Sequence, residues 1–397
     1  MSQRPNMLSI VLVVLIVVAG IAGYFAGSAT APQAPPSGVA TVTVTATKTA
    51  TVTTTATQGT PSTVYKWRMV SAFPSGEPRF DVEKYFVNLV KNMSNGRLII
   101  ELYPGGELFP VPQTFDMVSR GTVDAAAIFL GYWVAEDPVM ALGASIPGPQ
   151  RTPDDVLYIY RATEDILRKH IEARGVLLVG PLDIVPSEVL VSRVPIRTLD
   201  DIKGKIIRTA GLSAKIYEKL GAKVVTLTAG EIYQALQLGT IDALEWADYE
   251  ADYILGYHEV AKYVLEAPPG YSLHSGAYPD SILILNPNSW NNLPDDLKEI
   301  VKGAAKAAYT WGIERTYFMA ELRGRQLWKN AGAEITVLSP EECKKIISVS
   351  MDIYVGLAKQ HADAKDFIVR LAKAWNDLGY AEWARALENA LRAEGLI

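Results

Sequence analysis

Two periodicities of hydrophobic and polar positions take turns along the chain after residue 64. Short apolar or β-branched runs, typical of strands, occupy residues 65–73, 97–104 and 122–130. Apolar side chains at helical spacing occupy residues 79–93 and 113–119. Strands that alternate with helices predict a parallel sheet covered by helices. We therefore expect an α/β unit here.

The alternation returns in a second stretch. The expected strands are residues 175–183, 187–195, 205–208, 223–227, 240–246 and 281–286, and the expected helices are residues 212–222 and 229–239. From residue 293 onward the spacing is helical, and a long proline-free stretch can form one helix that spans both units. Two α/β units joined by several crossings predict two lobes with a cleft between them.

The N-terminal part of the chain has a different composition. Residues 7–27 contain an uncharged apolar run that is long enough to cross a bilayer as a helix. Arg4 precedes this run and no Lys or Arg follows until Lys48, so residues 1–6 should stay cytoplasmic and the rest should be exported. The alternative is a cleaved signal peptide, since small residues follow the run. Residues 28–64, rich in Thr, Ala and Val, predict an extended linker between this membrane anchor and an extracytoplasmic body.

Composition and motifs argue against several function classes. The net charge is −5 and no Lys/Arg cluster is present, which disfavours a nucleic-acid partner. The single cysteine, Cys343, excludes an intrachain disulfide, and the scattered histidines form no HExxH motif. No GxSxG elbow or Gly-rich phosphate loop occurs. A binding protein without a required cofactor therefore outranks an enzyme.

Candidate ligand-binding side chains stand where expected strands end. These are Arg208, Glu245 and Trp246, together with Tyr132 and Trp133. Ligands of open α/β sheets bind beyond the carboxyl ends of the strands. Arg208 can hold a carboxylate through two parallel hydrogen bonds or form a structural salt bridge. Glu245 can pair with Arg208, ligate a cation or bond a ligand hydroxyl, and the aromatic side chains can wall a pocket or belong to the core.

Several segments, in this order, resemble the DctP-type solute receptors of tripartite ATP-independent (TRAP) transporters. The most specific are KGKIIRTAG, GEIYQALQLGTIDALEW and NPNSWNNLP, and the similarity covers residues 65–340. It is greatest to members that take 2-oxo acids, lactate and similar monocarboxylates, whose motif ends in Glu-Trp. The resemblance implies a two-lobed, periplasmic-binding-protein-like α/β fold with a long connecting helix and C-terminal helices. We expect lobe I at residues 65–187, lobe II at 188–285, and a return segment with a helical C-terminal region at 286–397.

The resemblance also implies roles for individual residues. Arg208 matches the arginine that clamps the ligand carboxylate. Glu245 and Trp246 match a pair that contributes to a Na⁺ or Ca²⁺ site bridging to the ligand. Tyr132 and Trp133 match a motif that lines the cleft from the first lobe. A later family Glu has His274, Asp280 or no residue as its counterpart here, and the Gly-Pro-Tyr-Asp run that follows Glu-Trp in relatives is also replaced.

The implied partners are a small organic acid and the membrane permease of a TRAP transporter. The alternative is a surface protein that senses its ligand and acts with a separate signalling partner. The helical region at residues 357–396 permits a homodimer of the kind relatives form. A membrane anchor with a Thr-rich linker suits an organism without an outer membrane, such as an archaeon.

Overall fold

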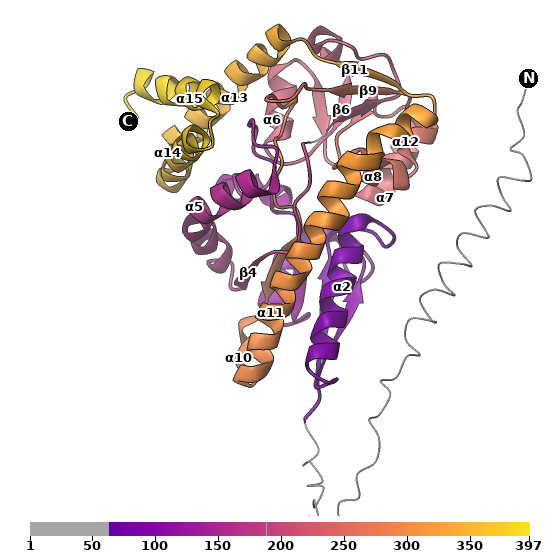
Figure 1. Ribbon diagram of the computed structural model, residues 1–397, viewed down its shortest axis with the longest axis vertical. Coiled ribbons are helices and arrows are strands. Elements are labelled where there is room, and N and C mark those ends of the chain that lie inside the picture. Colours follow the sequence, from indigo (N-terminus) through magenta and orange to yellow (C-terminus); the bar gives the residue numbers. More distant parts are fainter. Residues whose placement is uncertain (1–62, 188) are drawn as a thin grey trace, which may run out of the picture. The chain divides into compact units, whose positions relative to one another are not determined.

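Two β-sheets organise the part of the chain that the computed structural model describes, which is residues 63–187 and 189–397 (Figure 1). The first sheet has the strand order β2-β1-β3-β10-β4. Its strands are β1 (Tyr65–Ser71), β2 (Leu98–Tyr103), β3 (Ala125–Ile128), β4 (Leu177–Pro181) and β10 (Ile282–Leu285). β1 is parallel to β2 and β3, whereas β10 is antiparallel to β3 and β4. The sheet is mixed where the sequence predicted a parallel one, because β10 returns from the second lobe in the opposite direction.

The second sheet has the strand order β11-β9-β5-β8-β6-β7. Its strands are β5 (Leu190–Ser192), β6 (Ile206–Arg208), β7 (Lys223–Val225), β8 (Ala243–Leu244), β9 (Tyr263–Glu266) and β11 (Glu334–Val337). β6 is parallel to both β7 and β8, and β5 is antiparallel to β8 and β9. Neither β9 nor β11 was predicted from the sequence. Both have only four residues, and β11 lies between two strongly helical stretches.

Local sequence signals explain where the helices of the lobes begin and end. They are α2 (Pro78–Met93), α3 (Thr114–Ser119), α4 (Pro138–Ala141), α5 (Pro153–Glu172), α6 (Ser213–Lys219), α7 (Ala229–Leu238), α8 (Tyr249–Ile254), α9 (Tyr257–Val260) and α10 (Pro287–Asn291). α7 starts with a capping box between Thr228 and Glu231 and ends at Gly239, whose φ is 74°. Short 3₁₀ turns are η1 (Val111–Gln113), η2 (Leu130–Trp133) and η3 (Leu199–Ile202).

A long helix connects the two lobes, as the sequence predicted. It runs through α11 (Asp295–Gly312), the π-helical segments η4 (Ile313–Phe318) and η5 (Ala320–Gly324), and α12 (Arg325–Asn330). Its first part packs against α2 and β4 of the first lobe, and η5 and α12 pack against α8 of the second. Figure 1 shows this helix, in orange, beside α2 and α8. A π-helical stretch in the middle of a helix is a common mark of a functional segment.

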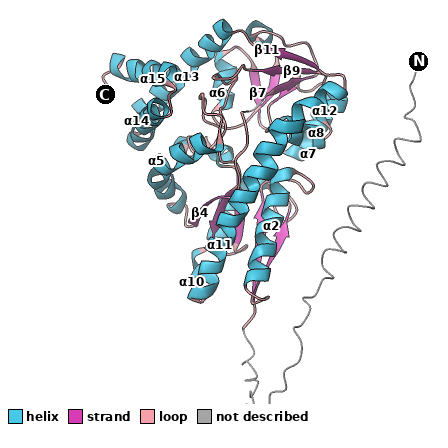
Figure 2. Ribbon diagram, viewed as in Figure 1, coloured by secondary structure: helices cyan, strands magenta, loops and turns pink. Residues whose placement is uncertain are grey.

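Three helices complete the C-terminal region, namely α13 (Pro340–Gln360), α14 (Ala362–Asp377) and α15 (Ala381–Ala393). They pack on one another, and α14 also packs on α5 of the first lobe. In Figure 2 α14 and α15 lie to one side of the molecule, and α13 leads to them from the second lobe. Cys343 and Ile346 of α13 belong to the apolar core of the second sheet, and α13 also packs on α6. The structure thus has the two-lobed α/β fold with a long connecting helix and C-terminal helices that the sequence predicted.

The N-terminal predictions fall on another part of the chain. The tip (1–6), the anchor or signal segment (7–27) and residues 28–62 of the linker lie outside the described residues. Within residues 63–187 and 189–397, no helix combines the length and the hydrophobicity that crossing a bilayer requires.

Candidate functional site

A small buried pocket lies where strand ends of the two sheets meet. Its lining residues are Phe73, Arg79, Phe129, Tyr132, Arg208, Ala210, Glu245, Trp246 and Asp280. They follow or end β1, β3, β6 and β8, except Arg79, in α2, and Asp280, just before β10. The cavity volume is about 10 Å³, which is room for about one water molecule. The carboxyl ends of strands from both lobes therefore converge on one place, as the sequence analysis expected for Arg208 and Glu245.

Arg208 is a buried guanidinium fixed mainly by backbone carbonyl oxygens. Its Nε donates to the carbonyl oxygen of Leu227 at 3.0 Å, and its Nη1 donates to the carbonyl oxygen of Glu245. The Glu245 carboxylate lies at 4.0 Å from Nη1, and the guanidinium carbon lies 4.6 Å from the centre of the Trp246 ring. The side chain is thus oriented rigidly, without a close carboxylate partner in these contacts.

Glu245 lies between Arg208 and His274. Its Oε1 is 4.0 Å from Nε2 of His274, whose Nδ1 is 2.6 Å from the Tyr217 hydroxyl oxygen. Burial lowers the pKa of His274 to about 4, so its imidazole is neutral near pH 7. His274 therefore adds no positive charge beside Glu245, and the cation next to this carboxylate is the Arg208 guanidinium. His274 is a contact of Glu245 and is not among the pocket-lining residues.

Tyr132 and Trp133, in the turn η2 that follows β3, lie in different surroundings. Tyr132 lines the pocket, and burial raises the pKa of its hydroxyl. Trp133 packs edge-on against Phe115, with ring centres 4.7 Å apart, and belongs to the core. The structure therefore brings Tyr132 to the pocket and does not bring Trp133 there. Successive residues of the turn η2 point in different directions, which explains the difference.

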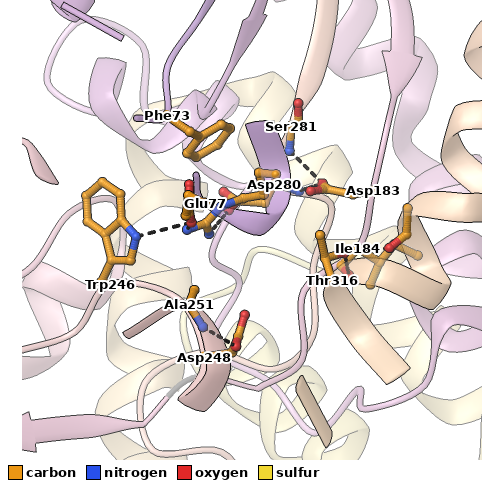
Figure 3. Close-up of polar contacts among 12 residues, drawn as sticks. Phe73, Glu77, Asp183, Ile184, Trp246, Asp248, Ala251, Asp280, Ser281 and Thr316 are labelled. Carbon is orange, nitrogen blue, oxygen red and sulfur yellow. Dashed lines mark hydrogen bonds and ion pairs between the residues drawn. The ribbon is translucent and has the colours of Figure 1, made fainter. Parts of the chain in front are cut away.

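An ion network that the sequence analysis did not identify forms one wall of the pocket. Arg79 is 1% exposed and pairs with the carboxylates of Glu77 and Asp280. Its guanidinium carbon lies 4.5 Å from the Phe73 ring centre and 5.6 Å from that of Trp246. Figure 3 shows Trp246, whose Nε1 donates to Oε1 of Glu77 at 3.5 Å, bridging the two lobes. The sequence signal for Arg79 was its position in the first turn of α2, where the helix dipole disfavours cations.

More carboxylates lie behind this network. Oδ1 of Asp183 accepts from the backbone N–H groups of Ser281, at 2.8 Å, and of Asp280, at 3.3 Å. The Ser281 hydroxyl donates to Glu83 at 3.0 Å. Burial raises the pKa of Asp183 to about 7, and it also raises the pKa values of Glu83 and Asp280. Asp183 and Glu83, behind Arg79, therefore bind protons more readily than exposed carboxylates, whereas Asp280 is paired with the Arg79 guanidinium.

The described residues offer only part of a metal site. They contain no group of three or more His, Cys, Asp and Glu side chains that could hold an ion. Glu245 nevertheless provides a buried carboxylate, and carboxylate and carbonyl oxygens are what Na⁺ and Ca²⁺ prefer. A cation here would need further oxygen atoms from the backbone and from a bound acid. The donor chemistry fits such an ion only together with a ligand.

The comparison with known families agrees with this architecture. The profile of the DctP family, described as "Bacterial extracellular solute-binding protein, family 7", matches residues 69–360. The chain belongs to this family. The resemblance inferred from KGKIIRTAG and the Glu-Trp motif is thereby confirmed, and the protein is a DctP-type solute receptor of the TRAP transporter class. Its place outside the cytoplasm follows from this membership.

Individual relatives of this receptor have named ligands. The monocarboxylate 2-oxoacid-binding periplasmic protein of Nostoc is 28% identical over 303 residues, which cover 76% of this chain and 81% of the relative. A TRAP solute-binding protein from Pseudoalteromonas atlantica, solved with sodium and pyruvate, has 22% identity and a TM-score of 0.72 over 83% of this chain and 99% of its own. One from Colwellia psychrerythraea, solved with calcium and pyruvate, has 23% identity and a TM-score of 0.71 over 84% and 99%. Both structures share the two-lobed fold.

Proposed function

We propose that this receptor binds a small monocarboxylate, namely a 2-oxo acid, lactate or a similar acid, and delivers it to a TRAP permease. The observation that carries the proposal is Arg208, a buried guanidinium held by the carbonyl oxygens of Leu227 and Glu245 at the pocket. A buried cation needs an anion nearby, and Glu245 approaches only to 4.0 Å. A ligand carboxylate fits this position. The named ligand of the Nostoc relative supports the same chemistry.

Other pocket residues would shape the ligand's surroundings. Tyr132 and Trp246 supply aromatic walls from the two lobes. Trp133, buried against Phe115, would act indirectly by holding the turn that carries Tyr132. None of these residues forms a nucleophile with an activating base, so the proposal is binding without catalysis.

A cation is part of the proposal. Bringing an anion to a pocket that already contains Glu245 and Asp280 adds negative charge in a buried place, which a Na⁺ or Ca²⁺ ion would offset. Glu245 would contribute its carboxylate, and Trp246, whose indole has no oxygen, would contribute its backbone carbonyl. Two structurally similar receptors that contain pyruvate also contain one of these ions.

Capture of the ligand would involve movement of the lobes. A cavity of about 10 Å³ does not hold an organic acid, so the ligand must enter a more open arrangement. The ligand would then favour closure, which is a population shift toward the state with more contacts. We further propose that residues 7–27 anchor the receptor and that residues 28–64 tether it near the permease. We also propose that the helical region at residues 357–396 forms a homodimer interface.

Ligand-dependent thermal stability tests the proposal. A ligand at about 100 times its Kd stabilises the folded state by about 2.7 kcal/mol. Pyruvate, lactate and longer 2-oxo acids should therefore raise Tm, whereas a matched neutral compound such as pyruvate methyl ester should not. If none of the acids changes Tm, with or without Na⁺ and Ca²⁺, the proposal is wrong.

A further inference from the structure

Arg79 lines the same pocket as Arg208, but its partners are carboxylates and not backbone carbonyl oxygens. The donors of Arg208 reach backbone carbonyl oxygens, whereas Arg79 faces two carboxylates, those of Glu77 and Asp280. Glu77 precedes α2 in the first lobe, and Asp280 lies just before β10, so separate parts of the chain fix the guanidinium. The rings of Phe73 and Trp246 also contact it, with ring centres 4.5 Å and 5.6 Å from the guanidinium carbon. Arg79 is therefore positioned before any ligand arrives, which lowers the entropic cost of binding.

One donor of this fixed side chain is left over. Nε and Nη2 of Arg79 are buried and make no hydrogen bond among the described residues, but Nη2 forms the ion pair with Glu77, which leaves Nε without a partner. Asp280 and Asp248 raise the pKa of Arg79 above its ordinary value against the effect of burial, so its N–H groups stay donors at every relevant pH. A buried donor without an acceptor is costly. An acceptor oxygen delivered with the ligand would remove that cost.

We propose that Arg79 recognises a second oxygen of the ligand, at C2, and so makes the receptor prefer 2-oxo and 2-hydroxy acids to plain carboxylic acids. This rests on the proposed function, in which Arg208 binds the carboxylate. Glu77 and Asp280 are positioning residues for Arg79. A site built around a hydrogen bond discriminates strongly against an analogue that lacks the bonding atom, because the donor of the site is then left unpaired.

A bound cation is the competing explanation for the same preference, since Na⁺ or Ca²⁺ could also bind the C2 oxygen. The two explanations differ in what abolishes discrimination. If Arg79 is responsible, changing its side chain abolishes it in any salt. If the cation is responsible, removing the ion abolishes it in the wild-type protein.

The experiment compares pyruvate with propanoate, which has the same carbon chain without the C2 oxygen. Calorimetric Kd values are measured on the full chain, in Na⁺ or Ca²⁺ and in choline with a chelator. We expect wild type to prefer pyruvate by about 10- to 100-fold. Arg79→Lys keeps the charge between Glu77 and Asp280 but removes Nε. It should cut the preference by about tenfold and change propanoate affinity little.

Two further variants keep the test decisive. The double variant Glu77→Gln/Arg79→Gln removes one charge of each sign, so it leaves no additional unpaired charge in the pocket. It is used in place of Arg79→Lys if the single variant does not fold. Arg315→Gln removes an arginine that pairs with Asp81 of α2 outside the pocket lining, and it should leave the pyruvate-to-propanoate ratio unchanged. The proposal is overturned if the Arg79 variants keep the wild-type ratio, or if wild type binds both acids equally. If wild type binds neither acid, the proposed function fails as well.

Discussion

Backbone carbonyl oxygens make Arg208 a different kind of buried cation from Arg79. A carbonyl oxygen carries only partial charge, so Arg208 keeps most of its attraction for an anion, while Arg79 is largely neutralised by Glu77 and Asp280. The two arginines therefore suit different atoms of one ligand. Arg208 suits the carboxylate, and Arg79 suits an uncharged oxygen.

Replacing Arg208 by Ala should cost a large part of the acid affinity. The change removes charge-assisted hydrogen bonds in a buried pocket, which contribute about 2–4 kcal/mol. Calorimetry with pyruvate measures the loss, and circular dichroism confirms that the variant is folded. Binding with the wild-type Kd would show that Arg208 does not hold the carboxylate.

Protonation of the buried Asp183 carboxyl group should make the stability of the protein depend on pH. Burial raises the pKa of Asp183 to about 7, well above its value in the unfolded chain, so the folded state binds more protons between about pH 4 and 7. The contribution of Asp183 to stability is then fully present below the unfolded pKa and is lost as pH rises through 7.

Asp183→Asn keeps the acceptor oxygen for the N–H groups of Asp280 and Ser281 but cannot ionise. Its Tm relative to wild type should therefore rise between pH 4 and pH 7, by a few degrees. Thermal unfolding at both pH values measures this difference. His274 acts in the opposite direction, because its lowered pKa favours the folded state as pH rises, but it is present in both proteins and cancels. A Tm difference that does not vary with pH would contradict the prediction.

Some of the pocket residues could be predicted from the sequence and others could not. Arg208, Glu245 and Trp246 stand at strand ends, and strand ends can be recognised from local periodicity. Tyr132 and Trp133 are adjacent in a turn, and local sequence does not say which of the two faces a pocket. Arg79 was missed because Asp280, its partner, is distant in sequence and comes close only through the return of β10.

At the scale of elements, the long helix depends on close approaches at glycine. An ideal Cβ at Gly312, the last residue of α11, would lie 2.3 Å from the carbonyl oxygen of Leu182. At Gly303, in the same helix, the nearest atom would be the methyl carbon of Met93 at 3.6 Å. The first distance is too short for real atoms, and the second is ordinary van der Waals contact. The two positions form a matched pair for substitution.

Gly312→Ala should destabilise the protein by about 1–3 kcal/mol, because backbone at Leu182 must shift. Gly303→Ala should be neutral or stabilise by about 0.5–1 kcal/mol, since Ala is the better helix former. Urea unfolding monitored by circular dichroism gives both values. Equal effects of the two substitutions would mean that the helix does not approach Leu182 as closely as the structure shows.

Helices and strands could be predicted from the sequence where their hydrophobic pattern extends over many residues. The capped helix α7 and the helix that connects the lobes agree with their sequence signals. The short strands β9 and β11 gave no usable period, and their pairing with each other joins segments far apart in the chain. The direction of β10 depends on the return of the chain from lobe II, which periodicity does not encode.

At the scale of the whole receptor, the two lobes are also joined by ion pairs outside the pocket. These ion pairs should affect how readily the lobes separate. Arg315, in the π-helical segment η4, donates to Asp81 of α2 at 3.1 Å and to Glu250 of α8 at 3.4 Å. Glu250 is also bound by Arg323 at 3.0 Å. Arg315 thus links one helix of each lobe through the long helix. It holds the two lobes together beside the small pocket without lining that pocket.

Arg315→Gln should therefore weaken binding of pyruvate and of propanoate by the same factor. The half-buried pair with Asp81 is worth about 1 kcal/mol, which is roughly a fivefold change in Kd, and Glu250 keeps Arg323 as a partner. Because loss of the link favours reopening, the change should appear mainly as faster dissociation, measured by stopped-flow tryptophan fluorescence. Lys302→Gln, which removes an ion pair with Glu299 inside α11, is the matched control and should leave dissociation unchanged. If Arg315→Gln releases the acid at the wild-type rate, the link between Asp81 and Glu250 does not contribute to closure.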